Sequence, residues 1–241
     1  MAIAVAVSLI VIIVPEIFGQ LSLNRASDYF SMPLGFIAFL LVIVASFFGS
    51  SSLLAEFHEK TGYSLFPNPV SRTSIWFGKF LAAELVSFFV VGIYFGIVMI
   101  ATFFKYQVLP EEVFLSLGFS LVALTTIMSI SFLVGAVFRG PTVAVILVFF
   151  LFILILPMID QLLISVLEVK PWFTPTFSEK IIQNIMIDPY PIDLAPGELP
   201  RGPFDVNRFV PYVRESLLVM IAYIVISSIV SIVIYKRREM S

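Results

Sequence analysis

The sequence predicts an all-α integral membrane protein with six transmembrane helices, and two observations carry the prediction. Hydrophobic residues make up 60% of the 241-residue chain and charged residues only 12%, whereas a soluble domain has about a quarter charged residues. The apolar residues also gather in six long stretches, and a membrane-spanning helix needs about 20 such residues in a row. A helix satisfies its own backbone hydrogen bonds, as lipid requires. A water-soluble enzyme is excluded.

The six stretches form a single transmembrane domain, residues 1–241. The predicted spans are residues 2–18, 33–50, 80–104, 113–138, 142–167 and 212–235. The first follows Met1 without a basic segment or a small-residue cleavage site, so we interpret it as a short helix rather than a signal peptide. We expect a polar loop at 19–32 and tight turns at 105–112 and 139–141.

Two connections are long, and six spans place them on opposite sides of the membrane. Each side carries seven Lys and Arg residues, which favour the cytoplasmic side when they lie near span ends. Those on the side of the termini and loop 51–79 are denser, and Lys236, Arg237 and Arg238 directly follow the last span. Acidic residues dilute the basic ones in loop 168–211. We therefore expect loop 51–79 in the cytoplasm and loop 168–211 outside the cell.

The fifth span is longer than a membrane core requires. Residues 142–167 would extend about 39 Å as a helix at about 1.5 Å per residue, against a hydrocarbon core of about 30 Å. The helix must tilt or break, and Pro157 favours a break because proline removes a helical hydrogen bond and clashes with the preceding turn. We expect residues 158–168 to form a separate outer segment, with Asp160 at the membrane interface.

The outer loop 168–211 contains one predicted helix, residues 178–187. Ser178 is its expected N-cap, and Glu179 lies in its first turn. Its isoleucines and its methionine form an apolar face for either the membrane or the helix bundle. Eight of the fifteen prolines lie in this loop, which predicts an ordered cap rather than a catalytic domain.

Loop 51–79 has the pattern of a short amphipathic helix. The apolar side holds Leu53, Leu54 and Phe57, with Glu56, Glu59 and Lys60 mostly opposite. Ser52 can cap this helix and Gly62 can end it. Taken by itself, the pattern also fits a solvated connector with a helix that lies on the membrane.

The third helix has its own start signal. Pro67 and Pro69 force a turn before it, and Ser71 is placed to cap it. Trp76 is expected at the membrane interface, where tryptophan is enriched.

The run from Glu56 to Lys79 resembles the loop after the second helix in permeases of type-two ATP-binding cassette (ABC) exporters. In that family, an acidic residue and Thr-Gly precede an apolar run, Pro-Val-Ser-Arg, and a Gly-Lys that opens the third helix. The matching residues here are Glu56, Glu59, Thr61, Gly62, Pro69, Val70, Ser71, Arg72, Gly78 and Lys79. The six-span plan and the outer segment between spans five and six are also similar. The amphipathic helix that usually precedes the first span is missing.

The resemblance implies the transmembrane subunit of an ATP-driven exporter in the cell membrane. Two such permeases, as identical copies or homologues, would form an alternating-access path in the lipid and pair with two cytoplasmic ABC ATPase subunits. Residues 52–62 would be the coupling helix that docks in an ATPase cleft. ATP and Mg would bind the ATPase, with no cofactor, metal or catalytic site on this chain. Indeed, Gly78 and Lys79 belong to no phosphate-binding loop, because Thr73 and Phe80 occupy positions that such a loop reserves for Gly and Ser or Thr.

Two alternatives remain. An ATP-independent secondary transporter or channel would show buried charges and broken helices, for which only Glu84 and Pro157 give a hint. An intramembrane enzyme is the weaker alternative. Glu111 and Glu112 resemble the paired glutamates of prenyl-protein proteases, but Leu115 stands where that family needs Arg, and no His lies within a span.

Composition excludes further chemistry. The chain has no Cys and a single His, His58, so disulfides, thiolate catalysis and the two-histidine metalloprotease helix are absent. The net charge of −2 argues against general binding of nucleic acid. The substrate is not defined, although the scarcity of charge suggests a lipid-like or hydrophobic molecule.

Small residues indicate where helices approach closely. Gly92 and Gly96 form a G-x-x-x-G pair in the third span, and Ser131 and Gly135 form a similar pair in the fourth. We expect both to pack within the bundle, with a subunit interface as the alternative. Glu84, about one turn inside the third span, is expected to form a structural ion pair with Lys79 or Arg139.

Overall fold

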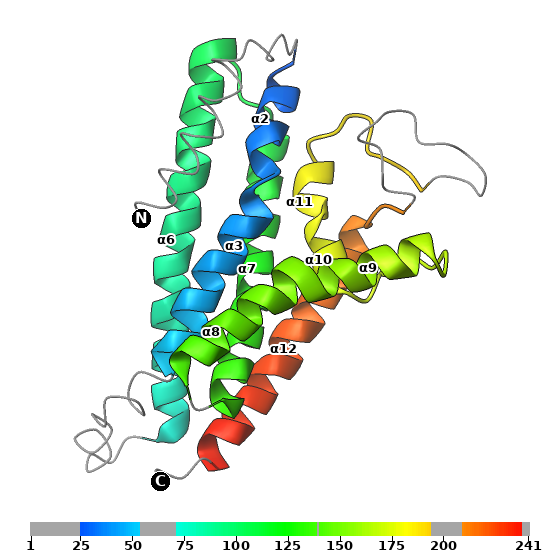
Figure 1. Ribbon diagram of the computed structural model, residues 1–241. Coiled ribbons are helices and arrows are strands. Elements are labelled where there is room, and N and C mark those ends of the chain that lie inside the picture. The colour runs from blue at the N-terminus through cyan, green and yellow to red at the C-terminus, as the bar shows by residue number, and fades with distance from the viewer. Residues whose placement is uncertain (1–24, 54–70, 139, 194–208, 238–241) are drawn as a thin grey trace.

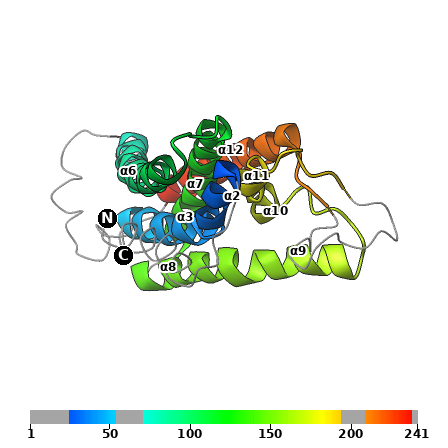
Figure 2. The same cartoon turned by 90° about the horizontal axis from the view of Figure 1, so that it is seen from above.

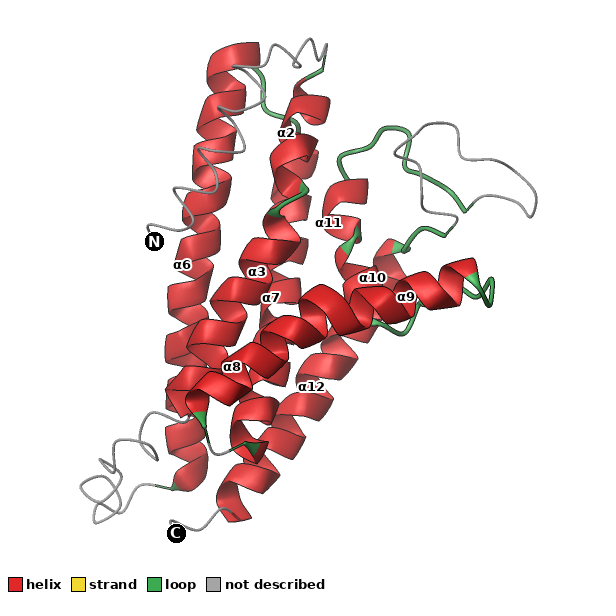
Figure 3. Ribbon diagram, in the orientation of Figure 1, coloured by secondary structure: helices red, strands yellow, loops and turns green. Residues whose placement is uncertain are grey.

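The computed structural model describes residues 25–53, 71–138, 140–193 and 209–237, and every regular element within these ranges is a helix (Figure 3). Five helices are long and apolar enough to cross a membrane: Ala26–Leu53, Arg72–Tyr106, Glu112–Val137, Pro141–Ser165 and Val213–Arg237. They correspond to the last five predicted spans. The first predicted span, 2–18, lies outside the described residues.

The first described helix begins earlier than its apolar run. It consists of α2 (Ala26–Leu34), α3 (Ile37–Ala45) and the π-helix η1 (Ser46–Ser50), and it continues to Leu53. The predicted polar loop 19–32 is therefore wrong from Ala26 onward. Asp28 in the first turn favours a helix start, and the aromatic rings of Tyr29 and Phe30 are buried in the bundle.

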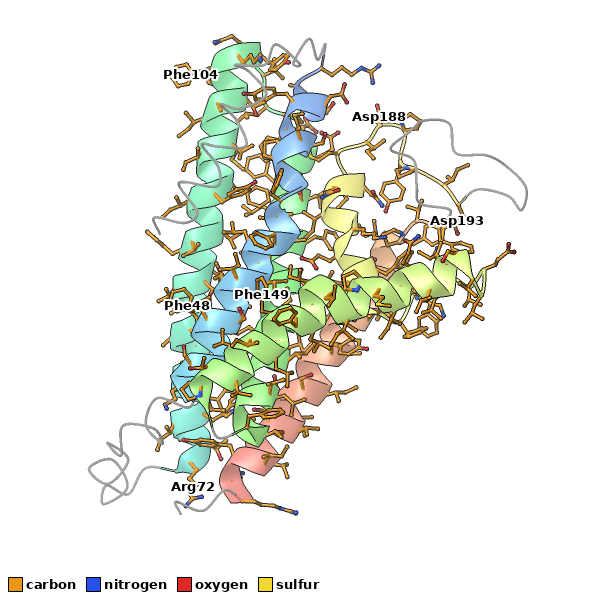
Figure 4. All side chains as sticks on the ribbon, in the orientation of Figure 1. Phe48, Arg72, Phe104, Phe149, Asp188 and Asp193 are labelled. Atoms are coloured by element: carbon orange, nitrogen blue, oxygen red, sulfur yellow. The ribbon has the colours of Figure 1, made fainter. Side chains whose placement is uncertain are left out.

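The long helix α6 (Arg72–Tyr106) begins where the sequence predicts. The Ser71 hydroxyl accepts a hydrogen bond from the Ser74 backbone N–H, so Ser71 is the N-cap. The helix ends at Gln107, which has a left-handed backbone with φ of 58°. Arg72 and Phe104 lie at its opposite ends (Figure 4).

Trp76 is buried rather than interfacial. Its side chain is 1% exposed, and its indole Nε1 donates a 3.0 Å hydrogen bond to Ser231 Oγ on α12 (Val213–Arg237). The indole also stacks on Phe80 and meets Phe132 edge-on. The interface prediction is wrong because the indole finds both its apolar contacts and its acceptor inside the bundle.

Helix α7 (Glu112–Val137) forms the centre of the bundle (Figure 1). It packs against α3, η1, α6 and α12, and also against two short helices within residues 168–193, which we name the outer segment after its predicted side of the membrane. Most of its hydroxyl side chains donate to the carbonyl four residues earlier, as Ser120 does to Ser116 and Ser131 to Ile127, both at 2.8 Å. These small side chains bury no unpaired donor, so neighbouring helices can approach closely.

The predicted break at Pro157 is wrong. The helices α8 (Pro141–Phe150) and α9 (Leu156–Ser165) are joined by the π-helix η2 (Leu151–Ile155) into one continuous 25-residue helix. The wider π turn lies just before Pro157, where the proline ring would otherwise clash with the backbone. The continuous helix lies along one side of the bundle (Figure 2) and crosses it obliquely (Figure 1).

Two short helices follow in the outer segment. They are α10 (Pro175–Glu179) and α11 (Ile181–Asn184). The predicted single helix 178–187 is wrong, because the first helix starts three residues before Ser178, after Thr174, with a proline in its first turn. Its predicted apolar face rests on the bundle, where Ile181, Ile182 and Met186 are buried.

Two long-range hydrogen bonds hold α11 in place. Ser116 Oγ of α7 donates to the Ile182 carbonyl at 2.8 Å, and Gln183 Nε2 donates to the Leu34 carbonyl at 2.9 Å. The outer segment is thus joined to both α2 and α7.

Candidate functional site

The predicted coupling residues lie mostly outside the described part of the chain. This holds for Leu54, Glu56, Phe57, Glu59, Lys60, Thr61 and Gly62, and also for the family-motif residues Pro69 and Val70. Leu53, at the near end, is fully buried, and its Cβ lies 3.7 Å from a Cβ built on Gly135 of α7. The last described residue before this segment is therefore packed in the core.

The motif residues at the far end of this segment join three helices. Lys79 Nζ of α6 donates a 3.0 Å hydrogen bond to the Ser52 carbonyl, across the base of the segment. Arg72 Nη1 donates to the Lys236 carbonyl of α12 at 3.1 Å. A Cβ built on Gly78 would meet nothing within 4 Å. Lys79 and Arg72 thus tie the start of α6 to the ends of the first described helix and of α12.

The two predicted small-residue pairs differ in their surroundings. A Cβ on Gly135 would lie 3.3 Å from the Ser50 carbonyl oxygen. A Cβ on Gly49 would lie 2.5 Å from the Ser131 Cβ. Ser131 and Gly135 therefore mark a close approach of α7 to η1, as expected. Among the described residues, nothing lies within 4 Å of a Cβ on Gly92 or Gly96. At these two positions α6 makes no close approach to another described helix, so the packing within the bundle that was expected of this pair is not observed.

Glu84 is a buried carboxyl within α6. One of its oxygens accepts a hydrogen bond from Thr125 Oγ1 of α7, and the other has no hydrogen-bond partner. The proposed partner Arg139 lies outside the described residues, and Lys79 donates to Ser52. The sequence pointed to charged partners, whereas the observed donor is a threonine one helix away.

A cleft of about 380 Å³ lies between α3, the η2–α9 part of the long helix and the two outer helices. Its apolar lining residues are Ile37, Ala38, Phe39, Val42, Phe152, Ile153 and Pro157. Its polar lining residues are Asp160, Gln161, Thr176, Glu179, Lys180 and Gln183. Its volume falls in the range of about 300–1,000 Å³ that is typical of ligand pockets.

Asp160 is a buried residue of this cleft, not an interfacial one. It is 3% exposed, and its two oxygens accept 2.6 Å hydrogen bonds from the hydroxyls of Thr174 and Thr176. The interface prediction is wrong because the outer segment folds back and supplies both donors. Burial lowers the pKa of Lys180, and the negative charge of Asp160 acts in the opposite direction. The charge of Asp160 is therefore partly balanced by that of Lys180.

Glu179 differs from Asp160 in its partners. It is 7% exposed, and its Oε1 has no hydrogen-bond partner. Burial raises the pKa of this carboxyl to about 8, because the charged form loses its hydration. Sequence reasoning treated Glu179 only as a helix-start residue, although an acidic residue beside Ser178 in an isoleucine-rich turn is a signal of burial.

A second polar group closes the outer segment. Lys170 Nζ lies 3.1 Å from Asp193 Oδ2 and 3.8 Å from the ring centroid of Tyr212. Asp193 also accepts a 2.6 Å hydrogen bond from the Val210 backbone N–H. These contacts fasten the end of the outer segment beside the start of α12, where Asp193 lies in Figure 4.

The geometry defines a class of protein. Five helices of membrane-spanning length enclose buried hydroxyl and carboxyl contacts and border a cleft that is partly polar. Within the described ranges, no group of three or more His, Cys, Asp or Glu side chains is placed to hold a metal ion. This is a multi-pass helical membrane protein.

Comparison with protein families adds the particular family. A family model described as "ABC-2 family transporter protein" matches residues 6–240. Because the match covers nearly the whole chain, the protein belongs to the ABC-2 family of transporter proteins, as a permease subunit. The resemblance carried by loop 51–79 and the span plan is confirmed at this level. A search of curated proteins returns no match.

Proposed function

We propose that this permease is the transmembrane half of an ATP-driven exporter and works by alternating access. The observation that carries the proposal is the ABC-2 family match over residues 6–240. That family is a membrane component of transporters and is not itself catalytic. ATP and Mg are then bound and used by a separate ABC ATPase, and a second permease copy or a homologue completes the path.

The force from the ATPase enters through residues 52–62. The anchors at both ends of the segment support this role, because Leu53 is packed in the core and Lys79 and Arg72 hold the start of α6. Because the described residues on both flanks of residues 54–70 are held in the bundle, a push on the predicted helix would be passed to the bundle.

The test is recovery of the ATPase with purified permease. Phe57→Asp places an unpaired charge in the proposed contact, which costs a few kcal/mol when it stays buried. We expect the variant to lose at least about 90% of the co-purified ATPase, while expression and membrane insertion stay near wild type. The matched control is Phe173→Asp, an exposed phenylalanine in the outer segment, which should recover the ATPase fully.

Two results would contradict the coupling role. Equal recovery with wild type and Phe57→Asp, with transport intact, would return the loop to a passive connector. Equal loss with Phe57→Asp and Phe173→Asp would show that the effect is not specific to the loop.

A further inference from the structure

We propose that the cleft between α3, α9 and α10–α11 binds a primary ammonium group on an apolar tail, with the ammonium against Glu179. The proposal rests on the proposed function, since it names the class of molecule that the transporter would contact. It follows from the charges, the hydrogen bonds and the space around one carboxyl.

Asp160 and Glu179, the two carboxyl residues of the cleft, differ in their hydrogen-bond partners. Asp160 accepts hydrogen bonds from two threonines, and its charge acts on Lys180. Glu179 Oε1 has no hydrogen-bond partner although the residue is 7% exposed. A buried carboxyl without donors is costly, so this side chain is prepared for a donor that arrives from outside.

The donor can arrive only from the cleft. On its other side, Glu179 lies among Ala123, Thr126, Ile127, Pro175 and Met220, where the remaining space does not admit a water molecule. Thr126 directs its hydroxyl at the carbonyls of Val122 and Met220. The cleft, at about 380 Å³, is the open side.

The apolar residues that line the cleft select the rest of the ligand. Ile37, Phe39 and Phe152 come from α3 and η2, two segments that contain no ionisable residue. An alkyl or aryl tail loses water contact along these residues, which stabilises binding by about 25 cal/mol per Å². An anionic head is disfavoured, because the negative charge of Asp160 opposes that of Lys180 and the Glu179 carboxyl offers no positive charge.

Binding is linked to a proton. With its pKa raised to about 8 by burial, Glu179 is mostly protonated near pH 7. When the ammonium binds, the carboxyl O–H releases its proton to solvent and the carboxylate accepts an N–H from the ammonium. Affinity therefore rises as pH increases through the pKa of Glu179, while an alkylammonium stays charged up to about pH 10.

Few other groups can produce this pH dependence. Helix α7 has no ionisable residue after Glu112, and α8 and α11 have none. Around the cleft, the remaining titratable groups of the described chain are Asp160 on α9, Lys180 and, on α12, Tyr223.

The experiment measures equilibrium binding of radiolabelled octylammonium to the full chain in detergent micelles, without the ATPase. We expect saturable binding that neutral octanol and anionic octyl sulfate do not displace, and that tightens between pH 6.5 and pH 8.5. Glu179→Gln should weaken it at least about tenfold and abolish the pH dependence. The matched control Glu111→Gln removes an exposed carboxyl outside the cleft and should change neither.

The wild-type measurements keep the test valid if Glu179→Gln fails to fold. Titration in two buffers of different ionisation enthalpy should detect about one proton released per octylammonium at pH 7. Repeating the binding measurement in nanodiscs distinguishes a lipid headgroup from a free amphiphile as the source of the ammonium. Weaker binding in phosphatidylethanolamine than in phosphatidylglycerol indicates a lipid headgroup, and equal binding indicates a free amphiphile.

Several results would overturn the proposal: no saturable binding, equal displacement by octyl sulfate, or the same affinity in wild type and a folded Glu179→Gln. None of them bears on ATPase coupling, because the permease is tested alone. Conversely, a failure of the Phe57→Asp test leaves this site standing.

Discussion

At the residue scale, the bundle depends on positions where a single methyl group decides whether helices can meet. Gly49 in η1 faces Ser131 on α7, and a Cβ there would lie 2.5 Å from the Ser131 Cβ and 3.0 Å from Met128 Sδ. Real Cβ atoms do not approach so closely, so the backbones themselves would have to separate. Gly92 on α6 is also helical, but a Cβ there meets nothing within 4 Å among the described residues.

These two glycines give a matched prediction. Gly49→Ala should destabilise the fold by about 1–3 kcal/mol through overpacking, whereas Gly92→Ala should be neutral or stabilising by up to about 1 kcal/mol through helix propensity. Thermal unfolding of both variants in the same detergent measures the difference. An equal loss of stability in the two would mean that the close packing of η1 on α7 is not as the structure has it.

At the element scale, the long helix α8–η2–α9 gave the clearest departure from expectation. Length arithmetic and Pro157 favoured a break, but the wider π turn at Leu151–Ile155 accommodates the proline within one helix. As a result, the buried residues Val148, Phe152, Asp160 and Ile164 stay on the side of the long helix that faces the bundle. A proline is a local signal, while the choice between a break and a wider turn depends on what packs against both sides of it.

The continuity of this helix can be tested with single cysteines, since the native chain has none. Spin labels at successive positions from 150 to 164 should report lipid exposure with one unbroken helical period. Maxima are expected at Leu154, Met158 and Leu162 and minima at Phe152 and Asp160. A change in the phase of lipid exposure at Pro157, or a loss of periodicity after it, would contradict the continuous helix and support a break at Pro157.

Other elements show what a single sequence reveals. Apolar run lengths and the Ser71 cap predicted four of the five described spans to within a few residues. The start at Ala26 was missed because Arg25, Ser27 and Asp28 look polar, while the burial of Tyr29 and Phe30 depends on neighbours far along the chain.

The cleft was missed for the same reason. Asp160 and its two threonines are separated by 14 and 16 residues and meet only because the outer segment folds back on α9. Motif residues such as Arg72 and Lys79 were found by resemblance, but their partners, the carbonyls of Lys236 and Ser52, carry no sequence signal.

At the scale of the whole molecule, the permease has two distinct ends. The anchors of residues 52–62 lie at the Arg72 end of α6, and the segment with α10, α11 and Asp193 lies along the bundle away from it (Figure 4). Helix α7 contacts both the η1 region beside Leu53 and the outer helices. Under the proposed coupling role of residues 52–62, a push on them would reach α10 and α11 through one central helix.

The central claim is that this chain works only as part of a complex with a separate ATPase, and native mass spectrometry of the affinity-purified permease tests it most directly. We expect a complex that contains two permease subunits, each 26.9 kDa if both are copies of this chain, and two ATPase subunits. The Phe57→Asp permease should lose the ATPase subunits selectively. A permease that is purified from its native membrane without any nucleotide-binding subunit, and transports without ATP, would contradict it.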